Sequence, residues 1–161
     1  MSVTKEKVRR TSSQSSIPGG SANHEDLLDR IENECLAALA SPHEERSVYE
    51  RALWQSRLGV QHEPDDEQYL RLYGMALTRM ERHAEALDVL ERSMELRTRT
   101  RRARPEVLAF LAISQHHLGR EEDAARSLAQ LRSLMQISTV MGVEHALEFL
   151  REAEALIAPQ R

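Results

Sequence analysis

The stretch LAFLAISQHHLG, residues 108–119, decides the fold expected for this chain. Its apolar residues recur at three- and four-residue intervals, which is typical of one face of an α-helix. Pro105 stands just before the stretch, where a proline suits the first turn of a helix. Gly119 ends it, because glycine adopts a left-handed cap conformation at little cost. The stretch therefore predicts a helix that ends in a tight turn.

An internal repeat extends outward from this stretch. Residues 67–98 can be aligned with residues 105–136 at an offset of 38 residues, and the turn at 80–82 then matches the turn at 118–120. Both units carry small residues at the two positions where paired helices touch, namely Gly74 and Ala86 in the first and Ala112 and Ala124 in the second. Small residues let helix backbones approach closely, while larger neighbours fill the space between pairs. Each unit is therefore predicted to form a helix hairpin.

Residues 108–119 resemble the helix–turn signature of tetratricopeptide repeats, whose unit has about 34 residues. Together with the closing stretch FLREAEALI, residues 149–157, they are similar to the repeat segments of bacterial, planctomycete-type proteins. In that family such segments often follow a serine/threonine kinase domain or β-propeller repeats. The resemblance covers about residues 64–157 and implies an interaction module tied to bacterial kinase signalling. Gln115 departs from the pattern, because the repeat usually has a bulky residue there, and weaker local packing is expected.

The rest of the chain completes a predicted all-α fold, a tetratricopeptide-like right-handed superhelix of about seven antiparallel helices. Residues 1–23 are expected to form a disordered, basic and serine-rich tail, because they have little apolar surface to bury. Residues 24–158 form the predicted repeat domain, with 24–62 as a degenerate first hairpin and 143–158 as a capping helix. A helix within the first hairpin is expected to carry the apolar residues Val48, Tyr49, Ala52, Leu53, Trp54 and Leu58. The alternative is an irregular helical bundle, since helices rich in alanine and leucine can produce such matches by chance.

Composition agrees with helices and limits the compartment. Only 4% of the residues are aromatic, whereas alanine, leucine, glutamate and arginine dominate and favour helices. The one cysteine, Cys35, has no partner for an internal disulfide and lies among apolar helix positions, so a buried structural thiol is expected. No apolar run follows the charged N-terminus, so neither a secretory signal nor a membrane span is predicted, and the expected location is the cytoplasm.

The first helix of each tetratricopeptide pair lines a concave groove that receives a guest peptide or helix. The alignment predicts as groove residues Gln68, Arg71, Met75, Thr78, Arg79, Glu106, Ala109, Ile113, His116 and His117. The guanidinium groups of Arg71 and Arg79 could hold a carboxylate of the guest through paired hydrogen bonds. The alternative is that both arginines are ordinary solvated helix residues.

A second candidate site is the basic patch, which consists of Arg97, Arg99, Arg101, Arg102 and Arg104. The whole chain has a formal net charge of −4, so positive charge is concentrated here. The patch could dock an acidic protein surface or phosphates, or it could be a solvated extension of a helix. Nucleic acid is the less favoured ligand, because no aromatic residue is interleaved for base stacking.

No catalytic, metal or cofactor site is predicted. His116 and His117 are neighbours on a helix, so their side chains point about 100° apart and are poorly placed to share one ion. No serine or cysteine has a recognisable base beside it, and the sequence has no kinase motif, so we do not expect an enzyme. The leading interpretation is a protein-binding scaffold. The alternatives are nucleic-acid or phosphate binding through the basic patch, and self-association through the end of an incompletely capped stack.

Overall fold

The computed structural model describes residues 32–98, 104–137 and 143–157, and it confirms that the fold is all-α. The described residues contain no β-strand, and none of their helices is long and apolar enough to cross a membrane. Residues 32–40 are helical, and the helices that follow are α2 (Arg46–His62), α3 (Glu67–Arg79), α4 (His83–Thr98), α5 (Pro105–His117), α6 (Glu121–Ile137) and α7 (Val143–Ile157). The predicted tail lies outside the described residues.

The helices α3 to α6 repeat in register. The first helices of the two hairpins begin at Glu67 and Pro105, and the second helices begin at His83 and Glu121, so matching helices start 38 residues apart. Within each hairpin the connecting turn is only a few residues long, which forces the two helices to run antiparallel. The offset seen in the sequence is therefore an offset between structural units.

The turns after α3 and α5 share one backbone conformation. Glu81 and Gly119, at matching positions, both have positive φ angles of 61° and 71°. In the first turn the amide of Arg82 donates to the carbonyl of Leu77 at 2.9 Å, and the equivalent bond in the second turn is 2.8 Å long. These bonds satisfy carbonyls that the helix end leaves open. Glycine adopts this conformation freely, whereas Glu81 does so against the preference of its side chain.

Small residues set the distance between the paired helices. A Cβ atom added to Gly74 would lie 2.5 Å from Cγ of Leu90, so α4 approaches α3 as closely as a glycine permits. Ala86, Ala112 and Ala124 are all completely buried. The helix hairpins therefore close over positions that are small in both units.

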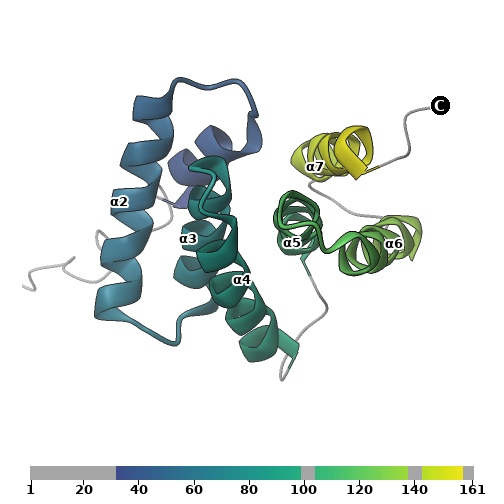
Figure 1. The fold of residues 1–161 in the computed structure, drawn as a ribbon. Helices are drawn as coiled ribbons and strands as arrows, with labels where there is room; N and C mark the ends of the chain where they lie inside the picture. The colour runs from purple at the N-terminus through teal and green to yellow at the C-terminus, as the bar shows by residue number, and fades with distance from the viewer. Residues whose placement is uncertain (1–31, 99–103, 138–142, 158–161) are drawn as a thin grey trace, which may run out of the picture.

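Packing between hairpins arranges the helices in two groups. The main partners of α3 are α4 and α2, the main partners of α5 are α6 and α7, and α4 joins the groups by packing against α5. Figure 1 shows α2, α3 and α4 on one side of the molecule and α5, α6 and α7 on the other. Phe110 of α5 meets Phe149 of α7 edge to face, with 5.4 Å between ring centroids. Within the described part of the chain, α2 and α7 lie at the margins and carry exposed apolar side chains, namely Trp54 on α2 and Leu147 and Leu156 on α7.

Candidate functional site

The predicted groove residues lie mostly inside the protein. Four of them, Arg71, Met75, Ala109 and Ile113, are at most 3% exposed, and Thr78 is 5% exposed. The side chains of Arg79, Glu106 and His116 are partly covered, and Gln68 and His117 are exposed. The expectation that these residues line an open groove therefore needs correction, because the chain's own helices cover most of them in this conformation.

Arg79 shows what covers this face. Its Nε donates to the carbonyl of Leu39, at the end of the 32–40 helix, at 2.9 Å. Its Nη2 donates to Oε2 of Glu152 on α7 at 2.8 Å, and its guanidinium lies 4.8 Å from the centroid of the Phe110 ring. A cation beside the last carbonyls of a helix is favoured by the helix dipole. Arg79 therefore holds the 32–40 helix and α7 together on the side of α3 that was predicted to receive a guest.

Arg71 holds the same face farther along α3. Its side chain has no exposed surface, its Nη2 donates to a carboxylate oxygen of Glu32, and its Nη1 lies 3.3 Å from Oε1 of Glu106. Among the residues that the structure describes, neither its Nε nor its Nη1 has a hydrogen-bond partner. Burial lowers the pKa of the Arg71 guanidinium, and the nearby carboxylates of Glu106 and Glu32 oppose that shift. Arg71 is therefore a buried cation that depends on two carboxylates from other helices.

The ion pairs of Arg71 continue into a longer chain. Arg104 lies between two carboxylates, with its Nε 3.2 Å from Glu67 and its Nη1 3.5 Å from Glu106. Glu67 in turn accepts a hydrogen bond from Nη1 of Arg97 at 2.9 Å. The ion-pair chain thus runs in the order Arg97, Glu67, Arg104, Glu106, Arg71 and Glu32, and it links the 32–40 helix with α3, α4 and the start of α5.

The predicted basic patch shares two residues with this ion-pair chain. Arg97 and Arg104, its first and last members, face carboxylates and are themselves only 17% and 26% exposed. Their charge is neutralised locally and is less able to attract a distant anion. The other three members, Arg99, Arg101 and Arg102, lie outside the described residues.

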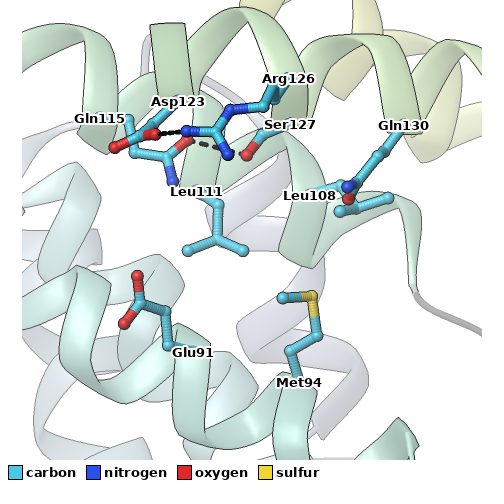
Figure 2. Close-up of a pocket in the computed structure, with 9 residues that line it drawn as sticks. All are labelled: Glu91, Met94, Leu108, Leu111, Gln115, Asp123, Arg126, Ser127 and Gln130. Atoms are coloured by element: carbon cyan, nitrogen blue, oxygen red, sulfur yellow. Dashed lines mark hydrogen bonds and ion pairs between the residues drawn. The ribbon is translucent and has the colours of Figure 1, made fainter. Parts of the chain in front are cut away.

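A hollow of about 160 Å³ opens on the other side of α5, between α4 and α6. We call it the outer groove. Figure 2 shows Leu111 of α5 and Met94 of α4 facing each other across it, with polar side chains of α6 along one rim. Glu91 of α4 also lines the hollow, and Gln130 of α6 lies at the end away from Gln115. The outer groove therefore joins an apolar floor to a rim that can form hydrogen bonds, as small peptide-binding sites do.

Gln115 forms part of this rim. Its Oε1 accepts a hydrogen bond from Oγ of Ser127 at 2.8 Å, and only 9% of the residue is exposed. The outer groove opens beside Gln115, so the weaker local packing predicted there stays a prediction, while the hydrogen bond with Ser127 satisfies the buried amide oxygen. Beside it, Arg126 pairs with Asp123, so the two charges of the rim compensate each other.

The histidines at the hairpin ends and the cysteine contact other side chains of the fold. The rings of His83 and His117 stack with 4.3 Å between centroids, which joins the start of α4 to the end of α5. Nδ1 of His116 lies 3.0 Å from Glu121. Within the described ranges no group of three or more histidine, cysteine or acidic side chains is placed to hold a metal ion. Cys35 is buried as expected, donates to Oε1 of Gln55 at 3.2 Å, and has its pKa raised to about 11, chiefly by burial.

Sequence reasoning missed the acidic partners of this site. Glu32 lies 39 positions before Arg71, and Glu152 lies 73 positions after Arg79. Helical periodicity identifies neighbours three or four positions apart, so it carries no signal for such pairs. An arginine that stands directly between Leu70 and Leu72 was the one hint in the sequence. Comparisons of this chain with models of known families, with curated proteins and with solved structures find no match.

Proposed function

We propose that this chain is a tetratricopeptide-like scaffold that binds a segment of another protein. The repeated register of α3 to α6 and the matching left-handed turns support the repeat architecture. Stacked hairpins of this kind present extended surfaces, and such surfaces suit peptides and helices.

The observation that carries the proposal is the outer groove. Its floor offers the half-buried Met94 and a small exposed part of Leu111 to an apolar side chain, and its rim offers amide and carboxylate groups to a peptide backbone. We propose as its occupant a partner peptide or helix that inserts one apolar side chain between α4 and α6. The face that was predicted from the alignment is filled by the 32–40 helix and α7, so the outer groove takes its place in the proposal.

Site-specific photo-cross-linking tests this function. A photoreactive residue replaces Gln130, at the rim of the outer groove, in the full chain expressed in its source cells. Gln136 is the matched control, because it is also an exposed glutamine of α6 but lies about 240° further around the helix. We expect Gln130, and not Gln136, to cross-link a discrete protein. The cross-linked segment must then bind the purified chain in calorimetry; a segment without measurable affinity would count against the proposal.

A second candidate function is self-association, which the exposed leucines of α7 favour. Leu147 and Leu156 are each 40% exposed on this last described helix. A second copy of the chain could cover them, as happens at the ends of incompletely capped repeat stacks. Sedimentation velocity at rising concentration tests this, with Leu147→Gln as the variant expected to shift the chain toward monomer. A single monomeric species at every concentration would remove this candidate.

A further inference from the structure

Trp54 is the exception among the aromatic residues of this protein. It is the only tryptophan of the chain, and 63% of its surface is exposed. By contrast, Tyr49, Phe110 and Phe149 are at most 7% exposed. Trp54 lies on α2, where the sequence predicted a helix, but its side chain is exposed. Successive residues turn by about 100°, so Trp54 points away from Ala52, which is buried.

Two arginines flank Trp54 on this outward face. Arg51 comes three residues before it and Arg57 three residues after it, which places them about 60° to either side. Both are exposed, and neither pairs with a carboxylate within residues 32–98, 104–137 and 143–157. The contrast on the same helix is Arg46, whose Nε lies 3.1 Å from Glu50. We call Arg51, Trp54 and Arg57 the Trp54 face.

The Trp54 face lies at the margin of the molecule. Figure 1 shows α2 at the edge, with α3 on its inner side. On its covered sides α2 contacts α3 through Gly59 and Tyr69 and the 32–40 helix through Gln55, whereas Trp54 is 63% exposed. Exposed tryptophan and arginine are the side chains most enriched at the energetic centres of protein interfaces. The composition and position of this face thus match a binding surface rather than a packing surface.

We propose that the Trp54 face binds a partner segment in which one large apolar side chain lies between two carboxylates. The apolar group covers the indole, and the carboxylates pair with Arg51 and Arg57. The two arginines are six residues apart, which is about 9 Å along the helix axis. On a partner helix, carboxylates about seven residues apart, with the apolar residue midway, span that distance. This inference rests on the proposed function and names a surface and a partner chemistry for it.

A protein partner fits this face better than nucleic acid does. A polyanion needs many phosphate contacts for useful affinity, and the face supplies only two unpaired cations. A protein segment with two carboxylates, by contrast, needs no more than these two arginines to pair its charges. Arg46 on the same helix is already paired with Glu50 and therefore adds no further unpaired cation to the face.

Tryptophan fluorescence gives a direct test, because Trp54 is the sole emitter of its kind. A displayed library of 16-residue peptides is selected on the full chain, and each enriched peptide is titrated while the emission of Trp54 is followed. We expect enriched peptides to carry an apolar residue flanked three or four positions away by Asp or Glu on each side. We expect them to shift the emission to shorter wavelength and to protect it from acrylamide, because they exclude water from the indole.

Charge exchange makes the test specific. With labelled peptide, Trp54→Ser and the double variant Arg51→Glu/Arg57→Glu should each weaken binding by about tenfold or more. A peptide whose two acids are replaced by lysine should bind the double variant and not the original chain. Arg120→Glu/Arg151→Glu is the matched control, since both residues are exposed arginines without a carboxylate partner in the described part of the chain, and it should leave affinity unchanged.

Three outcomes would overturn the inference. Peptides that bind without changing the emission of Trp54, or equally well to the double variant, place the surface elsewhere; a cross-link at Gln130 would then still uphold the proposed function. Emission that shifts with a single-stranded oligonucleotide, and with no selected peptide, assigns the face to nucleic acid. The absence of both enriched peptides and a cross-linked protein removes the inference and the proposed function together.

Discussion

Replacing the two carboxylates that face Arg71 tests the central electrostatic feature of the fold. Glu32 and Glu106 both lie within ion-pair distance of the guanidinium, which has no exposed surface. At the 3.3 Å separation of Arg71 and Glu106, an effective dielectric of about 20 gives a gross attraction of about 5 kcal/mol. Much of that attraction offsets the cost of removing the charges from water. The contribution of these ion pairs to stability is therefore measured best by removing the two carboxylates while the cation stays in place.

We expect each single change, Glu32→Gln or Glu106→Gln, to lower the free energy of unfolding by about 1–2 kcal/mol, because one carboxylate remains and an amide oxygen can still accept a hydrogen bond. The double variant leaves Arg71 buried without a counter-charge and should lose about 4–6 kcal/mol, more than the two single changes together. Adding Arg71→Met to the double variant should recover most of that loss, since a methionine, although shorter, is flexible and apolar and needs no counter-charge.

Urea unfolding at low salt, followed by circular dichroism at 222 nm, measures these differences. The slope of the unfolding free energy against urea concentration should be the same for all variants, which checks two-state behaviour. Glu50→Gln, which removes an exposed ion pair with Arg46, is the control and should have no measurable effect. The reasoning is refuted if the double variant loses no more than the sum of the single variants, or if Arg71→Met fails to restore stability in its background.

Three further predictions concern packing, reactivity and pH. Gly74→Ala should lower the free energy of unfolding by about 1–3 kcal/mol in urea melts, because the new Cβ would lie 2.5 Å from Cγ of Leu90; a neutral effect would mean that α4 shifts freely. Cys35 should react with a thiol-specific reagent at pH 8 only in urea, because its pKa of about 11 keeps the native thiol protonated; rapid reaction without denaturant would contradict its burial. Burial and the neighbouring His117 hold the pKa of His83 below 6.5, so its contribution to stability is present above pH 6.5 and is lost as the pH falls toward the folded value. Between pH 7.5 and 5.5 the melting temperature should therefore fall less for His83→Gln than for the original chain. Equal decreases would exclude His83 as a source of the pH dependence.

Local sequence signals predicted the helices and turns of this protein well. Glycine at position 119 predicted a left-handed turn, and the turn has that conformation. The repeat aligns residue 81 with residue 119, and Glu81 adopts the same backbone conformation although its own chemistry gives no hint of it. A repeat is thus more informative than residue preference alone, because it transfers geometry from a clear unit to an unclear one.

The candidate site was less predictable, and Arg71 shows the reason. A charged residue beside an apolar stripe is normally assigned to solvent, because burying an isolated charge is costly. That assignment fails when distant parts of the chain supply compensating charges, as Glu32 and Glu106 do here. The exposure of Trp54 was equally hidden, because the sequence predicts that a helix carries this residue but not which side of the helix other helices cover. Both features depend on tertiary contacts that periodicity does not encode.

The filled inner face explains why binding surfaces are sought on the outside of this protein. Two clear repeat units present little core of their own, so the apolar residues of α3 and α5, such as Met75 and Ile113, need cover from other helices. The 32–40 helix and α7 supply this cover. The covered residues then stabilise the fold and are not accessible to a partner peptide. The exposed rim of the outer groove, such as Gln130, and the Trp54 face do not have this structural role, although Leu111 on the groove floor is only 2% exposed and belongs to the core. Substitutions at Gln130 or on the Trp54 face should change binding and leave the unfolding midpoint unaltered. Substitutions at Met75 or Ile113 should lower both together, because on the inner face recognition and folding depend on the same contacts.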